Sequence, residues 1–223
     1  MFLVLSIGCL VTPAWADYWS GMDAYMRGDY ATAAREWRPL AEEGHAQAQV
    51  NLGWLYVNGQ GVLQDYALAR QLFVKAAEQG QAEAQYNLAQ LHHGGKGGPQ
   101  DYVQARQWYE KAALQGNVDA QVNLGTLYLN GRGVSEDYQQ ALFWFLLAAK
   151  QGSALAMTKM GLMYERGDGV AQDFVQAHKW YNLGGAYGEK MGAESRDDLA
   201  RRMTLAQIAE AQQLAKEWKR IAP

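Results

Sequence analysis

The pattern of apolar and polar residues repeats every 36 positions over most of the chain. Four consecutive units align without a gap at residues 45–80, 81–116, 117–152 and 153–188. With positions numbered 1 to 36 in each unit, Ala, Leu, Gly and Tyr recur at positions 4, 8, 9 and 12, the spacing of one face of an α-helix. Periods of this length are typical of stacked helical units. The pattern therefore predicts a first helix over positions 3–14 of each unit.

Glycine and aspartate mark the turn that follows this first helix. Positions 15 and 17 are Gly in all four units, which allows the positive φ values that end a helix and reverse the chain. Position 21 is always Asp, where a carboxylate can cap a second helix, and Gln three residues later completes a capping-box pattern in three units. Gly at position 36 predicts that this second helix ends near position 35.

Two flanking segments depart from the repeat. Residues 17–44 resemble a unit whose long turn is deleted, and we expect them to form an N-terminal capping half-repeat. Residues 189–223 no longer follow the period. There, a capping-box pair formed by Thr204 and Gln207 precedes an amphipathic stretch, which predicts a C-terminal capping helix from Leu205 to about Trp218. Such caps are expected because terminal repeats in a stack must cover their apolar ends.

The first sixteen residues have the features of an export signal. They contain no charged residue and end in Ala14-Trp15-Ala16, the small-residue pattern that precedes signal cleavage. We therefore expect cleavage between Ala16 and Asp17 and export to the bacterial periplasm or the medium. Lipidation of Cys9, which follows Gly8, is the alternative. Loss of Cys9 leaves a mature chain without a thiol, which suits an oxidising compartment.

Composition and charge narrow the function classes. The net charge is −3 and no basic run exceeds Arg201-Arg202, so we expect no nucleic-acid partner. The single Cys excludes a disulfide framework and a thiolate zinc site. After residue 16, no segment is apolar over the roughly 20 residues that a transmembrane helix needs. The 24 Gly residues follow mostly from the fixed glycine positions of the repeat.

The sequence contains little catalytic chemistry. Its four histidines are His45, His92, His93 and His178, of which only two are adjacent, and neighbouring histidines on a helix point to different sides. The Ser, Asp and Glu residues form no signature of a triad, a metal site or a phosphate loop. We therefore expect a protein that is not an enzyme and has no metal and no cofactor.

The fullest copy of the unit spans residues 117–152 and carries A-Q-x-N-L-G-x-L-Y-x-N-G-x-G-V-x-x-D-Y-x-x-A. It resembles the Sel1-like repeat, a relative of the tetratricopeptide repeat with a longer turn. The resemblance covers nearly all of residues 17–188 and implies an all-α fold, a right-handed superhelix, or solenoid, of stacked helix-turn-helix repeats. It also implies a non-catalytic adaptor that binds other proteins. The copy at 81–116 departs from the pattern at Leu91-His92-His93-Gly94.

By analogy with tetratricopeptide grooves, we expect partner contacts at positions 3, 6, 10 and 13 of the first helices, which would line the concave face. Trp54 and Tyr86 are the expected anchors, because rigid aromatic side chains dominate binding hot spots. Packing between helices is the alternative role for both. Six further expected contact residues are Val50, Gln90, His93, Val122, Thr126 and Leu129. The remaining residues at these positions are Gln47, Val57, Glu83, Asp119, Leu155, Thr158, Leu162 and Glu165.

Asparagine recurs at position 7 as Asn51, Asn87 and Asn123. We expect these side chains to hydrogen-bond to the neighbouring repeat, with contact to a peptide backbone as the alternative. The whole pattern favours an exported, monomeric scaffold that binds a protein or peptide along the concave face. The alternative function is binding of an envelope glycan or peptidoglycan fragment, with Trp54 and Tyr86 as stacking platforms.

Overall fold

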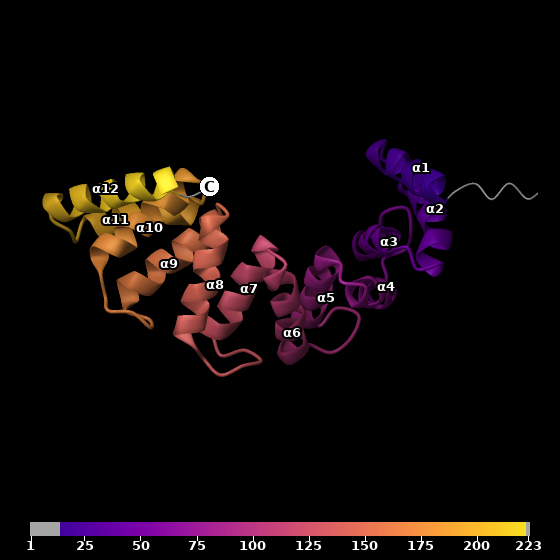
Figure 1. Ribbon diagram of the computed structural model, residues 1–223, viewed down its shortest axis with the longest axis horizontal. Helices are drawn as coiled ribbons and strands as arrows, with labels where there is room; N and C mark the ends of the chain where they lie inside the picture. The colour runs from indigo at the N-terminus through magenta and orange to yellow at the C-terminus, as the bar shows by residue number, and fades with distance from the viewer. Residues whose placement is uncertain (1–13, 222–223) are drawn as a thin grey trace, which may run out of the picture. The chain divides into compact units, whose positions relative to one another are not determined.

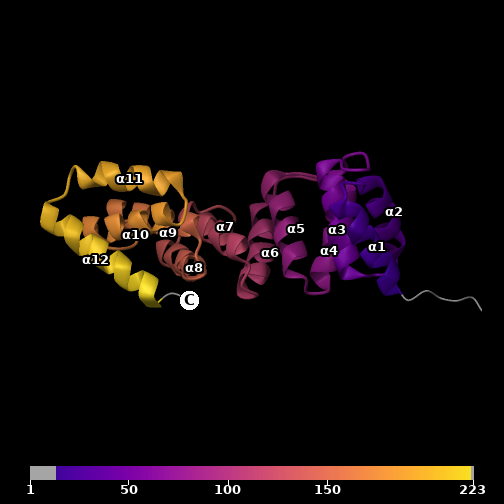
Figure 2. The same ribbon diagram turned by 90° about the horizontal axis from the view of Figure 1, so that it is seen from above.

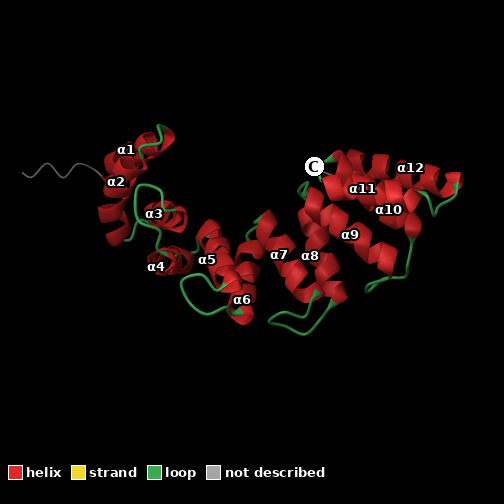
Figure 3. Cartoon of the chain, turned by 180° about the vertical axis from the view of Figure 1, so that it is seen from behind, coloured by secondary structure: helices red, strands yellow, loops and turns green. Residues whose placement is uncertain are grey.

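The structure is a computed structural model that describes residues 14–221, and in this range it contains twelve α-helices and no β-strand (Figure 3). The prediction of an all-α fold built from helical hairpins is confirmed. The export signal expected over residues 1–16 lies outside the described residues except for its last three, with which α1 begins. The chain divides into two compact units, residues 1–84 and 85–223, and α5 (Ala82–Gly94) runs across the boundary.

The first unit contains two helical hairpins, drawn in indigo and purple in Figure 1. Their helices are α1 (Ala14–Met26), α2 (Tyr30–Glu42), α3 (Ala46–Asn58) and α4 (Tyr66–Glu78). The first hairpin lacks a long loop, because Gly28 adopts a φ of 79° and turns the chain directly into α2. Trp37, Leu40, Leu52 and Leu55 form a core that this hairpin shares with α3, together with small alanines that let the helices approach closely.

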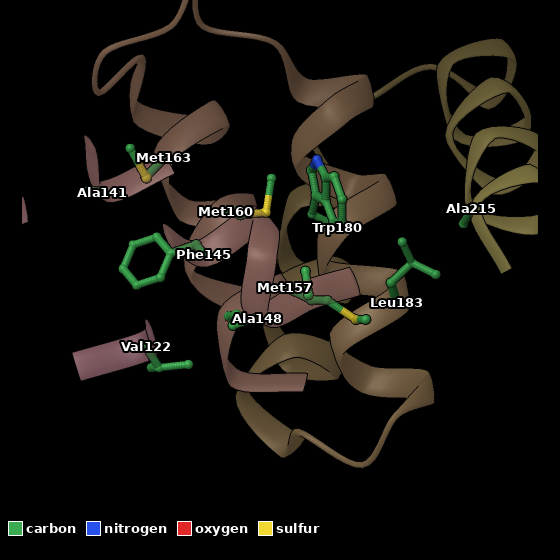
Figure 4. Close-up of a cluster of buried hydrophobic side chains, with 12 residues drawn as sticks. Val122, Ala141, Phe145, Ala148, Met157, Met160, Met163, Trp180, Leu183 and Ala215 are labelled. Atoms are coloured by element: carbon green, nitrogen blue, oxygen red, sulfur yellow. The ribbon is translucent and has the colours of Figure 1, made fainter. Parts of the chain in front are cut away.

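The second unit continues this pattern with consecutive helices packed on one another. After α5 they are α6 (Tyr102–Leu114), α7 (Val118–Leu129), α8 (Tyr138–Lys150), α9 (Ala154–Arg166), α10 (Phe174–Ala186), α11 (Lys190–Ala200) and α12 (Leu205–Ile221). Its largest core cluster contains Phe145, Met157, Met160, Met163 and Trp180, which come from α8, α9 and α10 (Figure 4). Side chains from successive hairpins thus share one apolar interior.

The glycines of the repeat have the two structural roles that their positions predict. Those at positions 15 and 17 have positive φ values between 62° and 81° in every unit, including Gly59 and Gly61. Those at position 9 lie against an aromatic ring of the second helix. A Cβ on Gly53 would lie 2.6 Å from Phe73, and one on Gly125 would lie 2.7 Å from Phe145. Glycine therefore sets how closely the two helices of a hairpin approach.

Each second helix begins at the expected aspartate, but the capping box is not formed. The Asp101 carboxylate accepts a hydrogen bond from the Gln104 N–H at 2.9 Å, as an N-cap should. Its own N–H, however, donates to the carbonyl of His92 at 2.9 Å. The N–H of Asp137 is likewise bonded to the carbonyl of Tyr128. The capping-box interpretation was wrong, because a carbonyl in the last turn of the first helix already accepts the hydrogen bond that the Gln side chain would accept.

Two helices, rather than the single expected one, follow the last repeat. Figure 2 shows α10 between α11 and α12, and both pack on it. The close approach of α11 depends on small residues, since a Cβ on Gly192 would lie 2.9 Å from the backbone nitrogen of Gly185. The capping box before α12 is present: the Thr204 N–H donates to Gln207 Oε1 at 2.9 Å, and the Gln207 N–H donates to Thr204 Oγ1 at 3.3 Å.

Candidate partner-binding site

A cavity of about 510 Å³ lies beside Trp54 in the first unit. Its volume is within the range of pockets that enclose small ligands or protruding side chains. Most of the lining is aromatic or carries a side-chain amide, and it consists of Met22, Tyr25, Trp37, Asn51, Trp54, Asn58, Gln60 and Glu83. Trp54 is 39% exposed, so its ring is accessible from the cavity and from solvent. Of the expected contact residues, this cavity includes Trp54 and Glu83.

Hydrogen bonds between α1, α2 and α3 hold the walls of this cavity in place. The indole Nε1 of the buried Trp37 donates to the carbonyl of Tyr18 at 3.2 Å. Asn51 Nδ2 donates to the hydroxyl of Tyr18 at 3.3 Å, while Asn51 Oδ1 accepts from Gln47 Nε2 at 3.3 Å. Asn51 therefore ties α3 to the preceding hairpin, as expected, whereas the buried Nδ2 of Asn87 at the same repeat position has no hydrogen-bond partner within the described residues. Preorganised walls of this kind lower the entropic cost of binding.

Position 6 is mostly part of the core and does not contribute a contact surface. Val50 is 0% exposed, and Val122 is 5% exposed within the cluster around Phe145. Thr158 at the same position is also buried, and its hydroxyl donates to the carbonyl of Ala154 at 3.1 Å. These three residues cannot touch a partner, so their assignment to the contact set is corrected. The analogy with tetratricopeptide grooves does not carry over at this position.

Tyr86 keeps part of its surface exposed but is tied to its surroundings by hydrogen bonds and ring contacts. Gln90 Nε2 donates to the Tyr86 hydroxyl, and the Tyr86 ring centroid lies 6.0 Å from that of Tyr109. Burial and the nearby carboxylate of Asp119 raise the pKa of Tyr86, against a hydrogen bond from Asn123 that lowers it. Tyr86 is therefore a neutral phenol at physiological pH, and Asn123 meets the preceding repeat as expected.

His93 also packs against aromatic rings. Its ring is edge-on to Tyr102 at 5.1 Å and to Tyr109 at 6.1 Å between centroids. Burial lowers the pKa of His93, and the charge of Arg132 lowers it further. The imidazole is therefore neutral near pH 7. These contacts indicate that the departure from the repeat at this position fills space between helices.

Three further expected contacts of the second unit, Thr126, Leu129 and Glu165, also make internal interactions. Thr126 Oγ1 donates to the carbonyl of Val122 at 2.8 Å, and Leu129 packs against the core cluster of α8 and α9. Glu165 accepts a hydrogen bond from the Tyr181 hydroxyl at 2.8 Å and one from Arg202 Nη1 at 2.8 Å. Glu165 thus holds the segment after α11 in place. In this unit, the predicted positions mainly stabilise the fold.

Sequence reasoning missed several lining residues and a recurring glutamine pair. Tyr25, Asn58 and Gln60 line the cavity from the half-repeat and from the turn, which lie outside the positions taken from tetratricopeptide grooves. The glutamine pairs recur with the period of the chain: Gln79 Nε2 donates to Gln49 Oε1 at 2.9 Å, and equivalent bonds join Gln115 to Gln85 and Gln151 to Gln121. Their shared spacing of 30 residues was the available signal.

We also searched the described residues for metal sites and for membrane-spanning helices. Within residues 14–221, no group of three or more His, Cys, Asp or Glu side chains is placed to hold a metal ion. No helix in this range is long and apolar enough to cross a membrane. His178 is buried, and both the burial and the charge of Arg196 lower its pKa, against Asp197, which raises it. These features describe a packed helical scaffold in which the cavity beside Trp54 is the candidate site.

Solved structures of similar proteins share this fold. A Sel1 repeat protein from Oxalobacter formigenes is 29% identical, with a TM-score of 0.79 over 90% of this chain and 82% of that one. A Sel1 repeat protein from Klebsiella pneumoniae subsp. pneumoniae is 28% identical, with a TM-score of 0.53 over 84% of this chain and 93% of that one. An immunity protein from Pseudomonas aeruginosa is 20% identical, with a TM-score of 0.54 over 91% of this chain and 83% of that one. At this level of identity the similarity shows the fold alone.

A search of curated proteins gives no match. The Sel1 repeat family model matches four consecutive segments, residues 46–81, 82–117, 118–153 and 154–186. These segments differ by one residue in register from the units defined by the 36-residue period, and together they cover more than half of the chain. The helix pairs, the glycine turns and the aspartate caps of the structure recur in each matched segment. The chain therefore belongs to the Sel1 repeat family.

Proposed function

We propose that this protein is an exported, monomeric, non-catalytic scaffold that binds a segment of a partner protein, with Trp54 as the central anchor. Sel1 repeat proteins are commonly protein-interaction scaffolds and are generally non-catalytic. The main support for this proposal is the cavity beside Trp54, because it combines an accessible indole ring with lining residues that hydrogen bonds hold in place. Binding energy at protein interfaces concentrates in such aromatic anchors.

The position of Trp54 agrees with this role. Trp54 is on α3 at position 10, one of the variable positions, so it is not needed to build the repeat. Its neighbours Leu52, Gly53 and Leu55 are buried and hold the helix in place. A partner side chain that enters the cavity would meet the indole ring, the Tyr25 ring and the amides of Asn58 and Gln60. Such a mixed lining is typical of specific binding pockets.

A capture experiment with the full chain tests the scaffold role. Immobilised wild type, Trp54→Ala and Trp19→Ala are exposed to envelope extract of the source organism, and bound proteins are quantified by mass spectrometry. Trp19 is the matched control, since it is 62% exposed in the same unit and does not line the cavity. We expect a protein that wild type and Trp19→Ala retain and Trp54→Ala loses. If no protein depends on Trp54, the proposal fails.

The export part of the proposal has its own test. It rests on the uncharged stretch of residues 1–16 and its Ala14-Trp15-Ala16 ending. Cell fractionation followed by N-terminal sequencing should place the protein outside the cytoplasm with Asp17 as its first residue. A lipid-modified N-terminus at Cys9, or a cytoplasmic chain that keeps residue 1, contradicts cleavage at this site.

A further inference from the structure

The lining of the cavity beside Trp54 contains a negatively charged side chain and no positively charged one. Glu83 is the only charged residue among those that line it, and the others are aromatic residues, amides and Met22. Glu83 is exposed in the first turn of α5, and within the described residues it makes no ion pair. A carboxylate at an aromatic-walled pocket favours a cationic guest, because the charge and the ring faces both attract a positive group.

No arginine or lysine of the first unit lines the cavity, and three of its arginines have partners elsewhere. Arg27, two residues after the wall residue Tyr25, is paired with Asp23. Arg35 is paired with Glu36 at 3.1 Å, and Arg38 donates to the hydroxyl of Tyr56 at 3.4 Å. None of these three arginines lines the cavity. The aromatic and acidic lining is therefore available to a cation from another molecule.

The aromatic walls offer ring faces for such a cation. Trp54 and Tyr25 are both partly exposed, at 39% and 37%. The Tyr25 ring centroid lies 5.8 Å from that of the buried Trp37, which keeps the Tyr25 ring in position. A planar guanidinium can stack on an indole ring while its N–H groups donate to a carboxylate and to amide oxygens. A lysine ammonium lacks this planar stacking surface.

We propose that this cavity holds the guanidinium group of an arginine side chain that a partner protein presents, with Glu83 as its counter-ion and Trp54 as its stacking platform. The inference rests on the proposed scaffold function and names the chemistry that the partner must carry. The amide oxygens of Asn58 and Gln60 are the additional acceptors in the lining. The partner segment therefore carries an exposed arginine.

Fluorine NMR on the full chain labelled with 5-fluorotryptophan tests this inference. The Trp54 resonance is assigned with Trp54→Phe, and the probe is the capped peptide Gly-Ser-Arg-Ser-Gly. The same peptide with citrulline, which keeps the shape and loses the charge, is the control ligand. We expect the arginine peptide to shift the Trp54 resonance with an affinity about tenfold above that of the citrulline peptide. Equal binding of the two peptides overturns the inference.

Substitutions in the protein test whether Glu83 is the counter-ion of the bound arginine. Glu83→Gln should reduce the affinity for the arginine peptide to that for the citrulline peptide, because the counter-ion is lost. Glu78→Gln is the matched control, since Glu78 is exposed on α4 and does not line the cavity, and it should bind as wild type does. An unchanged affinity of Glu83→Gln overturns the role of Glu83. A lysine peptide that binds as tightly as the arginine peptide overturns the choice of a guanidinium.

The failures of the two proposals can be distinguished. A protein that is captured through Trp54 but binds Glu83→Gln as well as wild type overturns the arginine inference and leaves the scaffold function intact. Charge-dependent binding of the arginine peptide, with no protein captured through Trp54, supports the cation pocket and overturns the scaffold function.

Discussion

Small residues at fixed repeat positions set the distance between helices. Ala120 is at position 4 of its unit, fully buried in the cluster that also contains Tyr109, Leu124 and Leu127. This position is Ala in all four units. The space that a larger side chain needs is already occupied by the neighbouring helices, because protein interiors are close-packed.

Ala120→Leu should therefore overpack this core and lower the free energy of unfolding by about 1–3 kcal/mol. Urea denaturation followed by circular dichroism measures the change. Ala206→Leu, at an exposed position of α12, is the control and should change the stability little. Equal unfolding midpoints for the two variants would show that position 4 does not limit helix packing.

Two glycines with positive φ allow the cost of backbone strain to be measured with and without a steric clash. Gly116 and Gly133 have φ values of 89° and 69°, which side chains rarely adopt. A Cβ on Gly116 would meet nothing within 4 Å, whereas one on Gly133 would collide with the backbone of Tyr102 in the preceding unit. Gly116→Ala should cost about 1–2 kcal/mol from strain alone, and Gly133→Ala should cost more. Thermal unfolding of the two variants measures the difference, and equal losses would contradict the close contact.

The structural role of a residue could be predicted wherever every repeat has the same residue at the same position. Ala at position 4 and Gly at positions 15 and 17 recur because each unit needs the same close approach and the same turn, so one sequence shows them four times. Exposure at position 6 could not be predicted in this way. Position 6 varies between units, as a contact position would, but Val50 and Val122 fill the core there, so sequence variation does not separate the two roles.

The sequence predicts α12 but not α11. α12 was predicted because an apolar stripe follows a capping pair. α11 was missed because its sequence KMGAESRDDLA is mostly polar and its contact with α10 uses the small residues Gly192 and Ala193. A helix that docks through small residues has no apolar periodicity to detect. In the structure, the N–H of the capping aspartate donates to a carbonyl in the last turn of the preceding helix instead of to the Gln side chain, and no local pattern indicates this bond.

The contact between α10 and α11 contains a buried histidine that makes stability depend on pH. His178 on α10 is 2% exposed, and its Nδ1 atom has no hydrogen-bond partner within the described residues. Burial lowers its pKa below the usual value, the charge of Arg196 lowers it further, and Asp197 opposes this effect. The folded state therefore binds this proton less readily than the unfolded state does.

Stability should be highest above the unfolded-state pKa of about 6.5 and should fall as the pH decreases below it, because unfolding then takes up a proton. His178→Leu removes this site, so its free energy of unfolding should fall less steeply than that of wild type between pH 7 and pH 5. Urea denaturation across this range measures the two slopes. Parallel slopes would show that His178 takes up no proton on unfolding, since His93 and the carboxylates are common to both proteins.

At the scale of the whole molecule, the described chain ends in a helix that covers the last repeat. Trp218 of α12 packs edge-on against Trp180 of α10, with ring centroids 4.8 Å apart. The Lys179 ammonium lies 4.4 Å from the Trp180 ring and 5.5 Å from the Trp218 ring, and burial lowers the pKa of Lys179. This aromatic contact joins the capping helix to the core of the second unit.

Trp218→Ala should loosen α12 and lower the free energy of unfolding by about 1–3 kcal/mol, because a large side chain is lost from a partly buried site. Thermal denaturation measures the loss, and binding of a hydrophobic dye reports the exposed end of the repeat. Gln212→Ala, at an exposed position of the same helix, is the control. A dye signal and a melting temperature like those of the control would contradict a capping role.

The fold of this protein was predictable from its sequence, whereas most of its candidate site was not. Repetition makes the architecture visible, because each structural position is sampled several times. The cavity beside Trp54 is formed by residues of the half-repeat, of the first full repeat with its turn, and of the start of the second full repeat, which supplies Glu83. Trp54 and Glu83 were found from their positions, but Tyr25, Asn58 and Gln60 required the packed structure.

Site-specific photo-cross-linking tests the central claim, that a partner protein occupies the cavity beside Trp54. A benzophenone amino acid replaces Asn58, an exposed residue of the cavity lining, in one strain and Phe143, which is 50% exposed on α8, in a control strain, so that Trp54 stays intact in both. After irradiation of intact cells, we expect a discrete protein adduct at position 58 that an excess of the arginine peptide suppresses, and none at position 143. Absence of a protein adduct at position 58, in cells that contain the exported full-length variant, would contradict this claim.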